Sequence, residues 1–297
     1  MKPHRRLLAA AALTLPFLLT GCRFTTRKLP VPKLPATTQS ATPEQLVAQL
    51  NQRWATLDSL TATVEIQASQ IKTKEGLAKD YTTFRGHILM RKPGLLRVLG
   101  QIPLLNTRLF DMASDGKNFT LYLPTQSKAF KGSNDLKKRS ASQIENMRPG
   151  FFFDAMMVRG LDSDDLYGVV ADTETIEDAT RKHLYSVPEY VLSISRPKPN
   201  SHQLIPVRVV TFHRDDLMPY QQDLYDSEGN LETEVIYSNY RDFDGRRFPS
   251  KVVIKRPQEE YRIVLTVEDV KQNQTPPLND DQFQIKIPDG TKIKNLE

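Results

Sequence analysis

The sequence predicts an α+β protein whose body is a large antiparallel sheet preceded by one helix. After residue 41, a capping box opens a segment with apolar residues at helical spacing. From residue 60 onward, apolar and polar residues alternate in short runs, which tight-turn pairs such as Asp115-Gly116 and Asp244-Gly245 separate. Short alternating strands joined by tight turns are typical of an antiparallel meander.

Residues 1–21 have the anatomy of a secretory signal. A basic start precedes a short apolar run over residues 7–19, and the run ends in Leu-Thr-Gly-Cys. This ending resembles the bacterial lipobox, in which the cysteine is acylated, so we predict Cys22 as the lipidation site. The alternative is an ordinary secretory signal followed by an unmodified cysteine. The run is shorter than the roughly 20 apolar residues that a bilayer span needs.

The composition limits the classes of function. Cys22 is the only cysteine, which excludes internal disulfides, CxxC metal sites and a thiol nucleophile in the body. The formal charge is +6, and the mature chain loses three basic residues with its leader. Nucleic-acid binding requires a clustered basic patch, so we expect no nucleic-acid partner. We expect a monomer.

A tether and a helix precede the predicted sheet. Residues 22–41 contain three prolines that favour an extended chain and prevent a helix, so they are expected to separate the body, residues 42–297, from the membrane. Thr42, Pro43 and Gln45 then form the capping box. The apolar stripe that follows includes Trp54. Such stripes usually face a core; the alternative places Trp54 at a ligand cavity.

Two sets of strands follow, separated by a different middle region. The first set is expected at 61–68, 81–91, 95–99, 107–113 and 118–123. The second set is expected at 190–195, 204–213, 221–225, 231–240, 248–256 and 261–270, with a short last strand at 283–288. Alternation places Phe119, Leu121 and Leu123 on one strand face, and Ile263 and Leu265 on another.

The middle region contains an apolar helical segment and an acidic stretch. Residues 140–159 are expected to form broken lid helices, interrupted at Pro149-Gly150. Residues 151–158 are apolar almost all round, so this helix is not simply surface-exposed. Residues 160–188 are predicted to be an acidic, irregular, solvated connection, because they lack the ligand spacing and central glycine of a calcium loop.

No catalytic motif is recognisable in the sequence. A Gly-x-Ser-x-Gly elbow, a phosphate loop and a His-Glu-x-x-His pair are all absent, so we predict no catalytic residues, no metal and no cofactor. The local cluster of His213, Asp215 and Asp216 fits the end of a strand that runs into a turn.

One connection between strands is unusually apolar. Ile102, Leu104 and Leu105 lie where loops are normally polar. They form either an exposed tip that inserts into a membrane or a partner's groove, or a strand edge packed on the body.

Several stretches together resemble the LolA/LolB family of bacterial lipoprotein carriers. They are Phe84-Arg-Gly-His-Ile-Leu-Met-Arg-Lys-Pro, Leu95-Leu-Arg-Val, Ser114-Asp-Gly-Lys, Leu121-Tyr-Leu-Pro and Asp280-Asp-Gln-Phe-Gln-Ile-Lys-Ile-Pro-Asp-Gly. The resemblance covers roughly residues 42–292. It implies an unclosed β-barrel, or half-barrel, with a helical lid over a hydrophobic cavity that accepts acyl chains.

On this resemblance, the protein is expected to bind acyl chains of lipids or lipoproteins and help deliver them to the outer membrane. Arg23, directly after Cys22, resembles the enterobacterial signal for outer-membrane sorting, with the body facing the periplasm. A periplasmic carrier protein is an expected partner, although the acidic stretch at 160–188 departs from the family. The alternative function is an envelope sensor or assembly factor that uses the same fold to bind a protein.

The resemblance also assigns candidate site residues. LolB-like members carry a protruding apolar loop, and Ile102, Leu104 and Leu105 occupy the corresponding position. The candidate cavity and lid residues are Trp54, Phe119, Leu121, Leu123, Met147, Phe152, Met156, Ile263 and Leu265. For any one of them taken alone, the alternative of filling an ordinary core fits better.

Overall fold

The computed structural model describes residues 38–72, 75–102, 107–134, 149–177, 180 and 182–296. The predicted signal peptide and most of the predicted tether, with Cys22, lie outside these residues, as do Leu104, Leu105 and Met147. No helix within the described ranges is long and apolar enough to cross a membrane.

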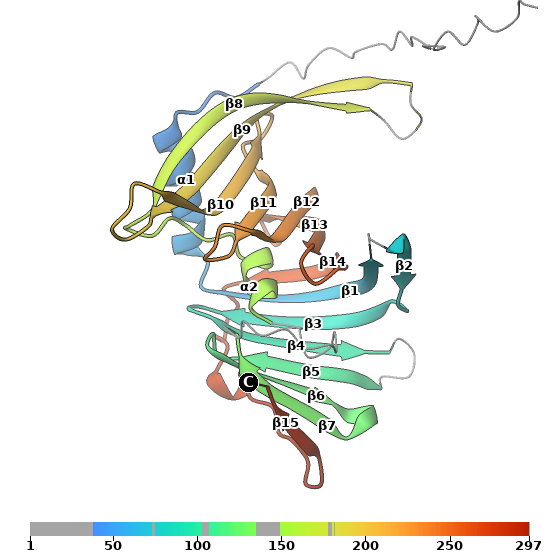
Figure 1. Ribbon diagram of the computed structural model, residues 1–297. Coiled ribbons are helices and arrows are strands. Elements are labelled where there is room, and N and C mark those ends of the chain that lie inside the picture. The colour runs from blue at the N-terminus through green and yellow to red at the C-terminus, as the bar shows by residue number, and fades with distance from the viewer. Residues whose placement is uncertain are drawn as a thin grey trace, which may run out of the picture.

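One large curved sheet makes up most of the body (Figure 1). Its strands run in the order β15-β7-β6-β5-β4-β3-β1-β14-β13-β12-β11-β10-β9-β8, and β2 pairs with β1 outside this path. All neighbours are antiparallel apart from β15 and β7. Because β8 and β15 end the order without pairing to each other, the barrel is unclosed. The predicted fold class, α+β with an antiparallel half-barrel, is confirmed.

Most strands lie where the alternating pattern predicted them, but two short strands, at residues 77–80 and 128–133, were not predicted. The first half contains β1 (Ser59–Lys72), β2 (Leu77–Asp80), β3 (Phe84–Arg91), β4 (Leu95–Gln101), β5 (Arg108–Ser114), β6 (Asn118–Leu123) and β7 (Lys128–Ser133). The second half contains β8 (Leu166–Glu177), β9 (Leu184–Pro197), β10 (Leu204–His213), β11 (Pro219–Tyr225), β12 (Leu231–Phe243), β13 (Arg246–Arg256), β14 (Tyr261–Gln272) and β15 (Lys292–Asn295). The turn at Asp115-Gly116 and the turn at Asp244-Gly245 both join neighbouring strands, as predicted.

Bulges and small residues allow the sheet to curve. The pairing register shifts between Thr63 and Val64 of β1, and similar shifts occur in β4, β9–β10 and β11. Such bulges bend a strand and increase its twist. Gly86 and Gly100 face each other across β3 and β4, and a Cβ at Gly100 would lie 2.4 Å from the Phe110 ring. These positions therefore have no room for a side chain.

The first helix forms as its sequence predicts. α1 spans Pro43–Thr56, and its capping box is formed by Thr42 and Gln45. Leu46 and Leu50 are buried against an apolar group on β9 and β10 that includes Leu192, Val210 and Phe212. The chain already contacts the body before this helix, because Gln39 N donates to Arg214 O at 2.7 Å. The last residues of the predicted tether are therefore held by the turn after β10.

Two predictions about local structure are wrong. Residues 160–188 are not irregular, because β8 and β9 form a long antiparallel hairpin at one edge of the sheet (Figure 1). Almost all of β8 is exposed on both faces, so no buried face produces an alternating pattern. Residues 283–288 are not a strand. A short 3₁₀ helix (Asp280–Phe283) with its own capping box ends at the first of these residues. The last strand, β15, begins at Lys292.

Candidate functional site

A short, phenylalanine-rich helix lies against the concave face of the sheet. α2 spans Gly150–Met156, so Pro149-Gly150 begins this helix where the sequence predicted a break. Its side chains at 151, 152, 153, 155 and 156 are all buried, as the all-round apolar pattern predicted. Figure 1 shows α2 on the inner side of the curved sheet, between its two halves.

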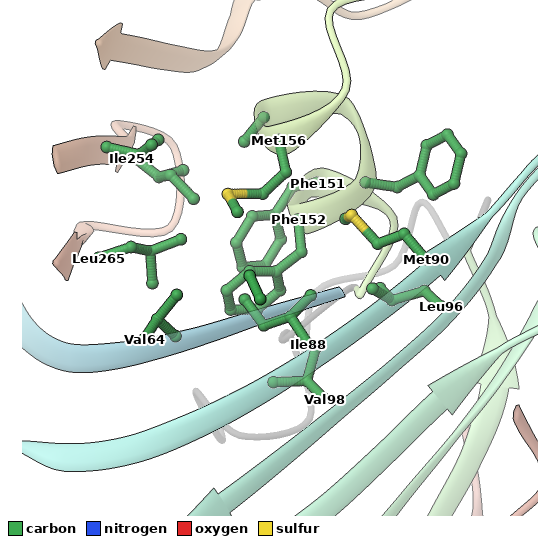
Figure 2. Close-up of a cluster of buried hydrophobic side chains, with 14 of the residues drawn as sticks. Val64, Ile88, Met90, Leu96, Val98, Phe151, Phe152, Met156, Ile254 and Leu265 are labelled. Carbon is green, nitrogen blue, oxygen red and sulfur yellow. The ribbon is translucent and has the colours of Figure 1, made fainter. Parts of the chain in front are cut away.

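The bed beneath α2 is made of aliphatic side chains from several strands. Figure 2 shows Phe151 and Phe152 pointing from the helix toward Ile88, and Met156 pointing toward Ile254. The same cluster contains Val64, Met90, Leu96, Val98 and Leu265, all buried. Phe151 and Phe152 stack with ring centroids 4.3 Å apart. The apolar concave face is therefore covered by a helix of seven residues, which is too short to be stable on its own.

Few polar contacts hold α2 in this position. At its C-terminal end, Tyr237 Oη donates to Ala155 O at 2.9 Å, and Gln222 Nε2 donates to Asp154 O at 2.9 Å. These bonds satisfy carbonyls that the end of a helix leaves without partners. Arg159 Nε pairs with Asp154 Oδ1 at 2.7 Å. Burial raises the pKa of Asp154, and the Arg159 guanidinium opposes that shift.

The polar network at this end of α2 is incomplete. Gln222 Oε1 and Arg208 Nε are buried and have no hydrogen-bond partner within the described part of the chain. Arg208 does donate from Nη2 to Gly160 O at 2.9 Å, just after the helix. A partly satisfied buried network stabilises one arrangement less than a complete network does. The docked position of α2 therefore rests mainly on apolar packing.

An open pocket of about 560 Å³ lies between α1, the end of α2 and strands β12 and β13. Its volume is within the range of small-molecule sites. Its apolar walls come from Leu50, Leu57, Met156, Val158, Met218 and Phe248, and its polar walls include Tyr237, Tyr240 and three arginines. Met156 lines the pocket and also packs in the cluster under α2, so the pocket adjoins the covered concave face.

The predicted cavity residues come together in the structure. Phe119, Leu121, Leu123, Phe152, Met156, Ile263 and Leu265 all belong to the one buried cluster that includes α2. Trp54 packs at its border, where its ring meets Phe153 edge-on at 6.5 Å and Lys92 Nζ lies 4.0 Å from its centroid. These contacts are those of a packing anchor. Of this set, Met156 alone lines the open pocket within the described residues.

The structure also shows the positions of Ile102, in the apolar loop, and of the cluster of His213 and Asp216. Ile102 is half-buried, and its N–H donates to Thr107 O at 2.9 Å across the apolar loop; the rest of that loop lies outside the described residues. His213 ends β10 and stacks on Tyr220, with centroids 3.7 Å apart, while Asp216 pairs with Arg247. This cluster is a strand end running into a turn, as predicted.

Sequence reasoning missed Tyr237, Gln222 and Arg53. Tyr237 and Gln222 hold α2 from strands more than 60 residues away in the chain. Arg53 lies one residue before Trp54 on α1, and the sequence pattern of this helix indicates only its apolar stripe. No local motif identifies these residues, since their roles come from long-range contacts. The alternation in β12 was the available signal for Tyr237, because it places that ring on the inner face.

Comparison with known proteins gives matches to solved structures. No protein-family model matches the sequence, and no curated protein matches it either. A LolA superfamily protein from Nitrosomonas europaea is 16% identical with a TM-score of 0.48, covering 83% of this chain and 99% of its own. A domain described as an outer membrane lipoprotein-sorting protein, from Vibrio parahaemolyticus, is 14% identical with a TM-score of 0.47, covering 80% and 94%.

A third solved structure, a DUF1329 family protein from Desulfovibrio piger, is 16% identical with a TM-score of 0.45, and the coverage is 80% of this chain and 94% of its own. All three similarities concern the fold alone.

Proposed function

We propose that this protein is a non-enzymatic lipoprotein of the outer membrane that binds acyl chains on the concave face of its half-barrel and helps deliver them to that membrane. The observation that carries the proposal is the apolar bed under α2. A bed of buried aliphatic side chains is covered by a seven-residue helix that a flexible chain can replace.

α2 and an acyl chain both present apolar surface to the same bed. Phe151, Phe152 and Met156 contribute apolar surface to the bed and no hydrogen bond from their side chains. A chain buried in their place gains about 0.8 kcal/mol per methylene. Releasing α2 breaks the Tyr237 and Gln222 hydrogen bonds to its carbonyls and the ion pair at Asp154. Release also exposes the buried apolar side chains of α2, at about 1.5–3 kcal/mol for each large one. A chain of about 16 carbons gains about 13 kcal/mol at the same scale, which is of similar size to these losses together, so the chain can displace α2 and the helix acts as a lid.

The predicted anchor completes the proposal. Acylated Cys22 holds the body at the membrane through residues 23–37, and Gln39 contacts the body. The apolar loop that starts at Ile102 is the proposed contact with the receiving bilayer. In this arrangement the protein's own chains anchor it, and its concave face carries the chain of another molecule.

Uptake of an acyl chain tests this function. The full-length chain with Cys22→Ser, which cannot be acylated, is expected to bind a fluorescent C16 fatty-acid probe with about one probe per protein. The unsubstituted protein is expected in the membrane fraction. Delipidated protein that takes up no probe at any concentration below the probe's own aggregation would contradict the proposal.

A second candidate function is an envelope sensor or assembly factor that binds a protein. The edge strand β8 favours it, because its outer backbone groups pair with no other strand in the described structure and Leu166, Tyr167, Val170 and Ile176 are exposed. Such an edge accepts a partner strand. Native mass spectrometry of material extracted from cells distinguishes the two: a bound lipid supports the first function, and a stoichiometric protein with no lipid supports the second.

A further inference from the structure

The open pocket beside α1 carries more positive than negative charge. Arg53, Arg246 and Arg247 line it, and Asp216 is the carboxylate that pairs with one of them, at 2.9 Å from Arg247 Nη2. Apolar side chains also line the pocket, among them Leu57, Met156 and Phe248. The pocket thus offers both charged and apolar groups to a ligand.

Arg53 is partly buried, whereas Arg246 and Arg247 are exposed. It is half-buried near the end of α1, and within the described ranges no carboxylate lies within 4.0 Å of it. Its Nη2 atom contacts Met218 Sδ, a weak acceptor. Burial lowers the pKa of Arg53, while Asp216 nearby opposes the shift. A guanidinium stays charged at neutral pH, so this group is a half-buried cation for which the described residues supply no strong acceptor.

We propose that this pocket binds the anionic headgroup of an acyl chain, a carboxylate or a phosphate, between Arg53 and Arg247. The inference rests on the proposed function and adds the class of amphiphile. A planar guanidinium matches carboxylate and phosphate oxygens in a forked geometry. The first methylenes then lie along Leu57 and Phe248, and the rest of the chain reaches the bed that α2 covers.

The test compares chains of equal length with different headgroups. Hexadecanoate, hexadecyl phosphate and hexadecanol are titrated into the full-length Cys22→Ser protein by calorimetry, with inorganic phosphate as a chain-free anion. Both anionic chains are expected to bind at least about tenfold more tightly than hexadecanol, the minimum for one charge-assisted contact. The anionic chain with the lower dissociation constant identifies the preferred headgroup. Inorganic phosphate alone is expected to bind weakly.

Arginine variants locate the effect. Arg53→Gln is expected to weaken both anionic chains about tenfold or more and leave hexadecanol unchanged. Arg247→Gln provides a second variant if the first folds poorly by circular dichroism. Arg85→Gln is the matched control, since that exposed arginine pairs with Glu268 on the sheet at 2.7 Å and lies outside the pocket.

The outcomes separate this inference from the proposed function. If hexadecanol binds as tightly as the anionic chains and Arg53→Gln changes nothing, the headgroup site is wrong and acyl binding stands. If inorganic phosphate binds as tightly as hexadecyl phosphate, the pocket is a site for free anions and the inference is overturned. If no chain binds at all, the proposed function fails as well.

Discussion

Replacing Tyr237 with phenylalanine is expected to destabilise the folded protein and, at the same time, to strengthen its binding of an acyl chain. Tyr237 is buried, and its hydroxyl donates to Ala155 O on α2 at 2.9 Å. Removing the hydroxyl leaves that buried carbonyl unsatisfied, which costs about 1–3 kcal/mol. This loss destabilises the conformation in which α2 is packed against the sheet.

The gain in affinity follows because the chain and α2 compete for one surface. An apparent dissociation constant falls as the binding-competent fraction of the protein rises. A loss of about 1.4 kcal/mol from the docked state therefore raises the apparent affinity about tenfold. Urea unfolding measures the first effect, and titration with hexadecanoate measures the second.

Tyr190→Phe is the matched control for this result. Tyr190 is also a buried tyrosine; its hydroxyl accepts from Ala41 N at 3.3 Å, in the cluster under α1. This variant is expected to lose stability without any change in affinity for hexadecanoate. A Tyr237→Phe protein that is folded and binds hexadecanoate no better than the unsubstituted protein argues against a lid.

Phe152→Ala is expected to have the largest effect on stability, a loss of about 3–5 kcal/mol in the free energy of unfolding. The Phe152 ring is 3% exposed, stacks on Phe151 and packs among the aliphatic side chains of the bed (Figure 2). Truncation removes this contact and leaves a cavity. Urea or thermal unfolding monitored by circular dichroism measures the loss.

The binding readout distinguishes a lid residue from an ordinary core residue. Because the proposed chain replaces the Phe152 ring, the variant is expected to recover much of its lost stability when hexadecanoate is added. Tyr167→Ala, an exposed aromatic on β8, serves as the control and is expected to change stability by less than about 1 kcal/mol. A Phe152→Ala loss below about 1 kcal/mol would mean that α2 is not packed as described.

The sequence predicted the fold well where local patterns dominate. The capping box at Thr42 places the start of α1, and alternation with hairpin turns places the strands from β9 to β14. The β8 strand was not predicted because it lies at a sheet edge with both faces exposed. Its sequence therefore lacks the alternation of apolar and polar residues that a buried face produces. β8 is held by backbone pairing with β9, and this pairing leaves no periodic pattern in the side chains.

The candidate site was predictable only in its composition. The apolar stretch after Pro149 indicated a covered helix, and the structure brings most of the predicted cavity residues into one cluster with it. Which groups hold that helix was not predictable, since Gln222 on β11 and Tyr237 on β12 are far from α2 in the sequence and reach its carbonyls only in the folded sheet. The same holds for the pocket, where Arg53 and Arg247 are nearly 200 residues apart in the chain.

In the proposed function, an acyl chain takes the place of α2 on the concave face. Hydrogen exchange of the backbone amides of α2, measured with and without bound hexadecanoate, tests it most directly. The expected result is faster exchange at Phe153 to Met157 in the complex, with unchanged or slower exchange in β1, β3 and β13 beneath them. Slower or unchanged exchange in α2 at saturating hexadecanoate would contradict the claim, because the helix would then remain docked while the chain is bound.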